Sequence, residues 1–258
     1  MELFVNPIAL WLIASRLSGW MLLSPGFAEI NTPQLTRAAM ILWLSYLLLP
    51  LVGPITPQAH LYTMPDIIVA VVGEFIIGAG YGLVLRLIFG AVQFGGVLLD
   101  NELGFLYAQQ VNPALPVSGG IFSRLFLLMA ILYFWTFDYF RIVMAAIHQS
   151  FILIPLGVMD RPLFDFAMLV KLGAALFAGG LTFAAPIMAL MFFVTITVGF
   201  LARTVQGMNI FSDVFVFKVA VGLIGILVFL PLLFFIMKVQ MEKIIPMSSE
   251  YFKFLSPS

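Results

Sequence analysis

Residues 74–90 read EFIIGAGYGLVLRLIFG, and this stretch decides which kind of fold the chain can adopt. Five residues recur at every fourth position and form one row along an α-helix: Glu74, Gly78, Gly82, Arg86 and Gly90. Glycines in such a row let a second helix approach closely, as they do where membrane helices pack together. The stretch therefore predicts a helix with a packing surface that also carries two charges.

These two charges need partners elsewhere. Glu74 and Arg86 would lie about 18 Å apart along a helix, too far to pair with each other. An ionised side chain that faces lipid costs at least ~2.5–3.5 kcal/mol, so we expect both to face protein, on this chain or another, or water. A proton or ion relay is one interpretation, but only Glu74 lies well inside an apolar segment, which favours hydrogen bonding between subunits. The same reasoning applies to the other cations of apolar segments: Arg16, Arg124, Lys171 and Lys218.

The composition places the chain among membrane proteins. Of its 258 residues, 63% are hydrophobic and 9% are charged, and the mean hydropathy is +1.14. A soluble domain of this length could not bury so much apolar surface. Twelve basic and twelve acidic residues balance, which argues against electrostatic binding of nucleic acid. We expect one all-α membrane domain over residues 1–258.

Some apolar segments are too long for one ordinary membrane crossing, so we expect hairpins or broken helices there. Helix propensity drops within these long segments at Gly95-Gly96, at residues 137–139, and at Gly179-Gly180 with Pro186. These three places are the predicted breaks. The apolar segments span residues 8–24, 38–53, 66–99, 121–157, 166–202 and 214–237.

The sequence offers no set of residues that would support catalysis. It has no cysteine and no phosphate-binding, zinc or serine-nucleophile motif. Asp100 and Glu102 point to different faces of a helix, so we interpret them as a solvated helix end and not as an acid–base pair. We therefore expect neither an enzyme nor a bound cofactor.

The stretch LLDNELGFLYAQQVNPALPVSGG, residues 98–120, is polar and rich in turn-forming residues between apolar neighbours. Polar groups stranded in lipid would each cost several kcal/mol, so the stretch must be buried in protein or line a water-filled space. Pro113 and Pro116 prevent a regular helix through its second half. We expect a compact loop between helices that end near 108 and begin near 121, either as a channel plug or as a surface turn.

Short motifs also follow one another in a fixed order along nearly the whole chain. They are Arg16-Leu-Ser-Gly19 with Pro25, Gly73-Glu74 with Gly78 and Gly82, Leu103-Gly104, Asn112-Pro113, Pro155-x-Gly157, Ala185-Pro186, and the stretch from Arg203 to Phe211. In this order and spacing they resemble the FliR/SctT family, an integral component of the type III secretion export gate. The chain departs from the family pattern at Asn112, where Asp is usual, and at Val205, where Pro is usual.

The resemblance implies long kinked helical hairpins that assemble with FliP and FliQ into a helical, ring-like export gate, with FlhB wrapped on it and FlhA nearby. Residues 134–157 are more similar to the flagellar branch of the family. The resemblance then implies a protein of the bacterial inner membrane at the flagellar basal body. Asp100-Asn101 is closer to the injectisome branch, where the protein is SctT and its partners are SctR, SctS and SctU. A secondary transporter also has glycine- and proline-broken helices, but it usually has paired inverted halves, which this chain lacks.

The resemblance also assigns residues. A loop at the matching position plugs the closed channel in the family, which implies a plug at residues 106–120, where exported proteins would pass. Its residues would be Leu106, Tyr107, Gln109, Gln110, Asn112, Pro113 and Pro116. Contacts between helices or subunits are expected at Arg16, Glu74, Gly78, Gly82, Arg86, Gly90, Arg203, Gln206, Asn209 and Phe211. Of these, Arg203, Gln206 and Asn209 are expected to stabilise a non-helical connection.

Overall fold

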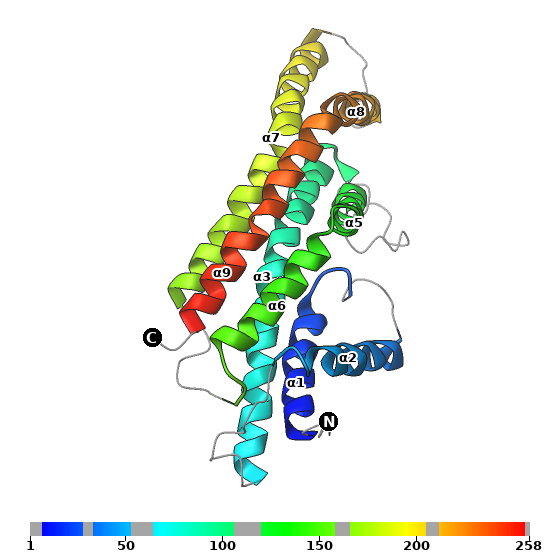
Figure 1. Ribbon diagram of the computed structural model, residues 1–258. Helices are drawn as coiled ribbons and strands as arrows, with labels where there is room; N and C mark the ends of the chain where they lie inside the picture. Colours follow the sequence, from blue (N-terminus) through cyan, green and yellow to red (C-terminus); the bar gives the residue numbers. More distant parts are fainter. Residues whose placement is uncertain are drawn as a thin grey trace. The chain divides into compact units, whose positions relative to one another are not determined.

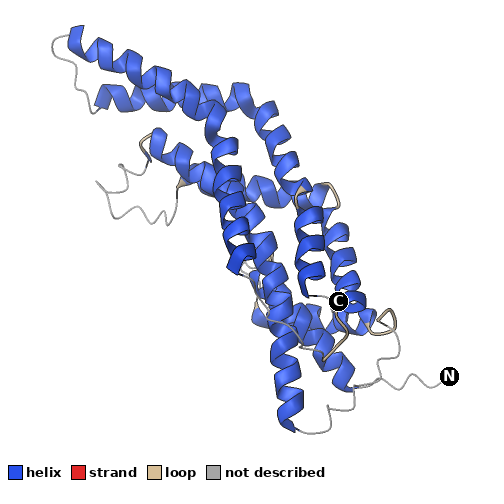
Figure 2. Ribbon diagram, turned by 90° about the vertical axis from the view of Figure 1, so that its left-hand side faces the viewer, coloured by secondary structure: helices blue, strands red, loops and turns tan. Residues whose placement is uncertain are grey.

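A computed structural model describes residues 7–27, 33–52, 64–105, 120–157, 166–204 and 212–255. Every regular element in these ranges is an α-helix (Figure 2). Figure 1 labels them along the chain: α1 (Pro7–Leu23), α2 (Gln34–Leu48), α3 (Met64–Glu102), α5 (Ile121–Thr136), α6 (Tyr139–Leu153), α7 (Phe166–Thr204), α8 (Ser212–Glu242) and α9 (Ile244–Leu255).

Several of these helices are at least long enough to cross a membrane. In the described ranges three helical stretches are long and apolar enough to cross one, and the bent pair α5 and α6 would make a fourth. Large apolar side chains such as Phe192, Phe193 and Leu227 are exposed on them, and exposed apolar surface of this kind meets lipid or other subunits. The chain is therefore an all-α membrane protein, as its composition predicts.

The helices group into two compact units, each built from separate stretches of the chain. Unit 1 contains Met1–Leu87, Phe134–Leu172 and Lys243–Ser258, and unit 2 contains Ile88–Tyr133 and Gly173–Glu242. The description of residues 1–258 as one domain remains a prediction.

Unit 1 is organised around α1. This helix begins at Pro7, where the missing N–H of proline costs nothing, and ends before Pro25 and Gly26. Leu12, Ile13 and Trp20 are almost fully buried, as expected for a helix that is apolar on all sides and surrounded by others. Helix α1 packs against α2, and α6 packs against α9.

Unit 2 contains the second part of α3, most of α5 and α7, and all of α8. Phe126 of α5 and Phe183 of α7 are fully buried and meet edge to face, with ring centroids 5.1 Å apart. The backbones of α3 and α7 come close together at Gly95 and Gly180: a Cβ added to Gly95 would lie 2.9 Å from the Gly180 carbonyl oxygen. The core therefore combines aromatic packing with close backbone approach.

Two of the three predicted helix breaks are wrong. Helix α3 continues through Gly95-Gly96, and α7 continues through Gly179-Gly180 with Pro186 inside it. The reason lies in packing, because a Cβ at Gly96 would lie 2.5 Å from the Ser123 Cα of α5. These glycines provide room for neighbouring helices, and a helix in an apolar environment tolerates an internal proline.

The third predicted break is confirmed. Helices α5 and α6 are bent by 72° across it. Asp138, immediately before α6, has φ of 57°, in the left-handed region that few residues other than glycine adopt. The polar residues there mark a real change of direction.

The helix ends on either side of the polar stretch, residues 98–120, agree only in part with the prediction. Helix α5 begins at Ile121, as expected, but α3 ends at Glu102 and not near 108. Gly104 follows with φ of 80°, and a glycine in this conformation just past the last turn is a common helix terminator. In the sequence, the Leu103-Gly104 motif therefore marks the end of α3.

Candidate functional site

A buried ion pair joins α1 to α3 in unit 1. Arg16 Nε donates to Glu74 Oε2 over 2.6 Å, and the two side chains are 3% and 1% exposed. Taking two charges out of water is expensive unless their remaining polar atoms are also bonded. The surroundings of both side chains meet this requirement.

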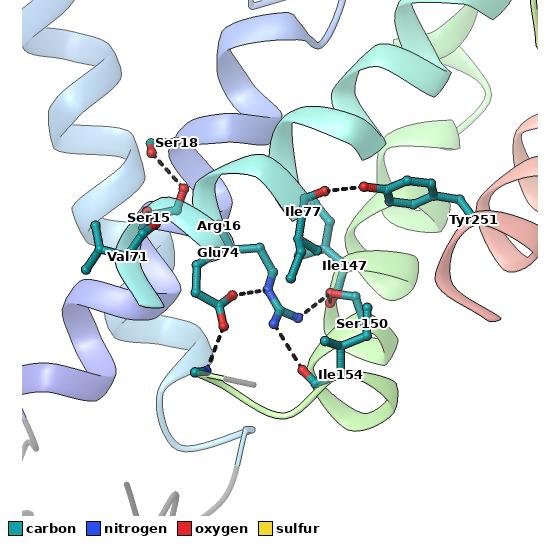
Figure 3. A network of polar contacts seen from close by, with 11 residues as sticks. Ser15, Arg16, Ser18, Val71, Glu74, Ile77, Ile147, Ser150, Ile154 and Tyr251 are labelled. Atoms are coloured by element: carbon teal, nitrogen blue, oxygen red, sulfur yellow. Dashed lines mark hydrogen bonds and ion pairs between the residues drawn. The ribbon is translucent and has the colours of Figure 1, made fainter. Parts of the chain in front are cut away.

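Figure 3 shows how the remaining atoms are satisfied by α6 and the turn that follows it. Arg16 donates from one terminal nitrogen to Ser150 Oγ over 3.1 Å and from the other to the Ile154 carbonyl over 3.0 Å. The second Glu74 oxygen, Oε1, accepts the Gly157 backbone N–H over 2.9 Å. The network therefore ties together α1, α3 and the end of α6.

Two further features fit the same network. Gly157 has φ of 79°, so the turn that presents its N–H to Glu74 suits glycine. The Arg16 guanidinium also lies over the Phe151 ring, 4.3 Å from its centroid, a cation–π contact that adds to the ion pair. Thus three motifs that are far apart in the sequence, at Arg16, Glu74 and Gly157, meet at one place.

Two glycines of the opening stretch lie beside this network, where α3 packs against α1. A Cβ on Gly78 would lie 1.8 Å from the Arg16 carbonyl oxygen, and one on Gly82 would lie 2.7 Å from that of Trp20. Gly19 of α1 reciprocates, because its Cβ would lie 2.1 Å from the Phe75 carbonyl oxygen of α3. The two backbones are therefore in direct contact, which brings Arg16 within reach of Glu74.

Gly80, which the sequence reasoning missed, faces α9. A Cβ there would lie 2.0 Å from Tyr251 Oη, and this hydroxyl donates to the Ile77 carbonyl over 2.9 Å. Gly78-x-Gly80-x-Gly82 thus serves two neighbours, because residues two apart on a helix point to different sides. The alternation of glycines at positions 78, 80 and 82 is the sequence pattern that could have indicated a second helix packed at Gly80.

The row from Glu74 to Gly90 is not one continuous surface. Arg86 is exposed, and Gly90 lies against Leu176, where a Cβ would be 3.2 Å from Cδ1. A row of every fourth residue advances by about 40° per step, or about 160° from Glu74 to Gly90. Glu74 finds its partners within the chain, so a subunit contact at this residue is not needed to explain its charge.

Asp100 is a second buried acid, this time in unit 2. Its carboxylate is fully buried and accepts the backbone N–H groups of Phe122 and Ser123, both over 2.9 Å. The interpretation of Asp100 as a solvated helix end is therefore wrong. Two bonds to the start of α5 replace water, and the partial positive charge of a helix N-terminus also favours a carboxylate.

The other predicted positions are placed less fully. Arg203 lies in the last turn of α7, so the prediction that it belongs to a non-helical connection is wrong. In the described ranges, no three side chains from His, Cys, Asp or Glu come close enough to hold a metal ion. The remaining predicted residues lie outside the described ranges: Leu106, Tyr107, Gln109, Gln110, Asn112, Pro113, Pro116, Gln206, Asn209 and Phe211.

Comparison with known proteins gives a consistent result. The chain is 28% identical over 183 residues to the flagellar biosynthetic protein FliR of Pectobacterium carotovorum, covering 69% of this chain and 70% of that protein. It is 23% identical over 236 residues to FliR of Bacillus subtilis, with 89% of each covered. The secretion system apparatus protein SsaT of Salmonella typhimurium is 24% identical over 231 residues, covering 88% of this chain and 85% of that protein.

A family model extends this similarity to nearly the whole chain. The model for bacterial export proteins, family 1, matches residues 8–244. These residues contain both halves of the Arg16–Glu74 pair, the α3 glycines and Asp100. The chain therefore belongs to family 1 of the bacterial export proteins, the FliR/SctT family that its ordered motifs resemble.

Proposed function

We propose that the chain is a component of the flagellar type III protein export gate, where it forms the channel entrance for flagellar subunits together with FliP- and FliQ-like proteins. The observation that carries the proposal is the family match over residues 8–244. The similarity to FliR proteins from distant bacteria supports the flagellar branch. The site of action would be the inner membrane at the flagellar basal body, with FlhB- and FlhA-like proteins nearby.

The charges on the long helices support a protein that works inside an assembly. Arg86 of α3 and Arg124 of α5 are exposed, although both helices are strongly apolar. An arginine that faced lipid at such a position would be costly, whereas a partner subunit or a water-filled channel can satisfy it. These two side chains are therefore the strongest candidates for contacts with the FliP- and FliQ-like subunits.

Residues 106–120 are proposed as the plug of the closed channel. The support comes from sequence: Gln109, Gln110 and Asn112 offer hydrogen bonds that water could replace on opening, and Pro113 and Pro116 disfavour a helix. A surface turn at this place is the alternative.

The experiment for the main proposal is deletion of the gene followed by complementation. Cells without it are expected to lose swimming and secretion of hook and filament subunits, and the wild-type gene restores both. The tagged chain, solubilised in mild detergent, is expected to bring FliP- and FliQ-like proteins with it, as measured by native mass spectrometry. A chain that purifies alone while swimming is unaffected by its deletion would contradict the proposal.

An injectisome role is the second candidate, because the chain is also similar to SsaT over most of its length. In that case the same deletion would leave swimming intact and abolish secretion through the needle, and the proteins that co-purify would be SctR- and SctS-like. The two branches are therefore separated by which secretion activity is lost.

A further inference from the structure

An open hollow lies in unit 1 between the start of α7 and the second half of α9, two helices that lie side by side there (Figure 1). Its volume is about 560 Å³, which is within the usual range of small-molecule sites in proteins. Every residue that lines it belongs to unit 1. We call this space the α7–α9 hollow.

The polar part of its lining carries a net positive charge. Lys171 of α7 and Lys253 of α9 contribute two ammonium groups, whereas Glu250 contributes one carboxylate and Ser249 one hydroxyl. Lys171 Nζ donates to Glu250 Oε1 over 2.5 Å, but both side chains are more than half exposed. An ion pair in so much water contributes little free energy, so Lys171 can exchange Glu250 for another anion. The hollow is therefore suited to a negatively charged group.

The rest of the lining is apolar. Met168 of α7 and Phe254 of α9 are half-buried in it. Beside the hollow, α7 also exposes the large apolar side chains of Phe166 and Val170. A small inorganic anion would gain nothing from these side chains, because their burial is favourable only against another apolar group. The lining as a whole therefore suits a molecule with a charged head and an apolar tail.

The hollow also lies where two candidate membrane spans end. The span Phe166–Leu201 begins at the hollow, and the span Val214–Leu255 ends at it. The ends of membrane spans lie at the depth of the lipid headgroups, and basic pockets between helices at this depth bind anionic headgroups. Lysines near the end of an apolar helix can reach that layer while their stems stay against apolar surface.

We propose that the α7–α9 hollow binds an anionic phospholipid. Lys171 and Lys253 contact the lipid phosphate, and the Ser249 hydroxyl donates a hydrogen bond to it. Met168 and Phe254 contact the acyl chains. Glu250 competes with the phosphate for Lys171 and thereby limits the affinity. The inference depends on the membrane fold and not on the role in export, so the failure of either leaves the other untouched.

The test measures lipid binding to the full-length chain, purified in mild detergent with its accompanying subunits, by native mass spectrometry. Delipidated protein is titrated with phosphatidylglycerol and with phosphatidylcholine of the same acyl chains. Lys171→Gln and Lys253→Gln are each expected to weaken the tightest binding of phosphatidylglycerol about fivefold, and the double variant about thirtyfold. Phosphatidylcholine should bind more weakly to the wild type and respond little to these changes.

The matched control is Lys238→Gln. Lys238 of α8 is a similarly exposed lysine that also pairs with a glutamate, Glu242, but neither residue lines the hollow. This substitution removes the same charge from the chain and should leave the binding of both lipids unchanged. An equal loss of phosphatidylglycerol binding in Lys238→Gln would show a general effect of net charge and would overturn the site.

Glu250→Gln is expected to change binding in the opposite direction. It removes the carboxylate that competes for Lys171, so phosphatidylglycerol should bind more tightly than to the wild type. Lys171, Lys253 and Glu250 are all exposed, so the melting temperature without lipid should stay close to that of the wild type in each variant. If the Lys171–Glu250 pair acts only by holding α7 to α9, Glu250→Gln would weaken lipid binding as Lys171→Gln does, and the inference would be wrong.

Three further outcomes would also overturn the inference. Equal affinity for the two lipids would show a lipid contact without recognition of the headgroup. Displacement of the lipid by millimolar inorganic phosphate would show a simple anion site. Unchanged lipid binding in the double lysine variant, together with loss of a co-purifying subunit, would show that an acidic protein surface occupies the hollow.

Discussion

Arg16 and Glu74 lie 58 residues apart in the sequence, yet their side chains form a 2.6 Å hydrogen-bonded ion pair that is almost entirely buried. Each of the three guanidinium nitrogens and both carboxylate oxygens has a partner. A carboxylate bound in this way is poorly suited to pass protons along a relay, because the paired guanidinium stabilises its charged form and each of its oxygens already accepts a hydrogen bond. The pair is better explained as the joint of three elements, α1, α3 and the turn after α6.

Removal of one partner from this joint is expected to be strongly destabilising. Glu74→Ala would leave the Arg16 guanidinium buried without its counter-charge, at a cost of about 3–5 kcal/mol. We expect less assembled complex in the membrane and a lower melting temperature of the purified complex, measured by intrinsic fluorescence.

The matched control is the exposed pair Lys171–Glu250, with side chains 64% and 52% exposed. Such a pair contributes about 0–1 kcal/mol, so Glu250→Ala should change the melting temperature and the amount of assembled complex very little. Replacement of both buried partners, as in Arg16→Met with Glu74→Leu, should recover much of the stability. Equal losses from Glu74→Ala and Glu250→Ala would contradict our reading of the joint.

Gly78 is expected to tolerate no side chain at all. A Cβ would lie 1.8 Å from the Arg16 carbonyl oxygen, and this backbone cannot move without disturbing the ion pair. Overpacking of this kind costs about 1–3 kcal/mol or more, so Gly78→Ala should prevent assembly, as followed by native mass spectrometry.

Gly199 of α7 is the control for that substitution. Nothing lies within 4 Å of its would-be Cβ, and alanine favours a helix over glycine by roughly 0.5–1 kcal/mol. Gly199→Ala should therefore leave the complex intact or stabilise it. Normal assembly of Gly78→Ala would remove the argument that α1 and α3 are in backbone contact.

Arg86 is expected to meet an acidic or carbonyl-rich surface of a partner subunit. Arg86→Glu should reduce co-purification of the FliP- and FliQ-like proteins, because like charges or carbonyl dipoles would then face each other. Arg86→Lys keeps the charge and should retain most of the assembly. If Arg86→Glu binds its partners as well as wild type, the residue faces a channel or lipid headgroups.

Deletion of residues 110–118 tests the plug. The complex should still assemble, because assembly depends on the helices, but cells should become permeable to small ions or dyes. Permeability would be measured by uptake of a dye that the intact inner membrane excludes. An assembled variant without added permeability would support the surface-turn alternative.

Several features of this fold could be predicted from the sequence because they depend on local or bulk properties. Composition predicts an all-α membrane protein, and the residues around Asp138 predict the bend between α5 and α6. The glycine row correctly indicates close packing on α3, but it cannot say which helix packs there. That choice depends on tertiary contacts, and the helical drift of the row sends Gly82 and Gly90 to different neighbours.

The two buried acids, Glu74 and Asp100, also show that the sequence does not reveal which distant residues come into contact. Asp100 sits among polar residues and resembles a solvated helix end, whereas its burial depends on the approach of α5 at Gly96 and Gly120. The partner of Glu74 could not be deduced because pairing across 58 residues leaves no local pattern. The sequence motifs nevertheless contain Arg16, Glu74 and Gly157, and the structure brings these three residues together.

The contact between Ile77 and Tyr251 spans 174 residues, and this has a consequence for how the chain is made. Helix α3 leaves the ribosome long before α9, so the notch at Gly80 stays open while the later helices are inserted. Unit 1 can close only after α9 has been synthesised and docked. Completion of unit 1 therefore depends on the docking of α9, and a nascent chain halted before α9 is made would leave the backbone around Gly80 uncovered.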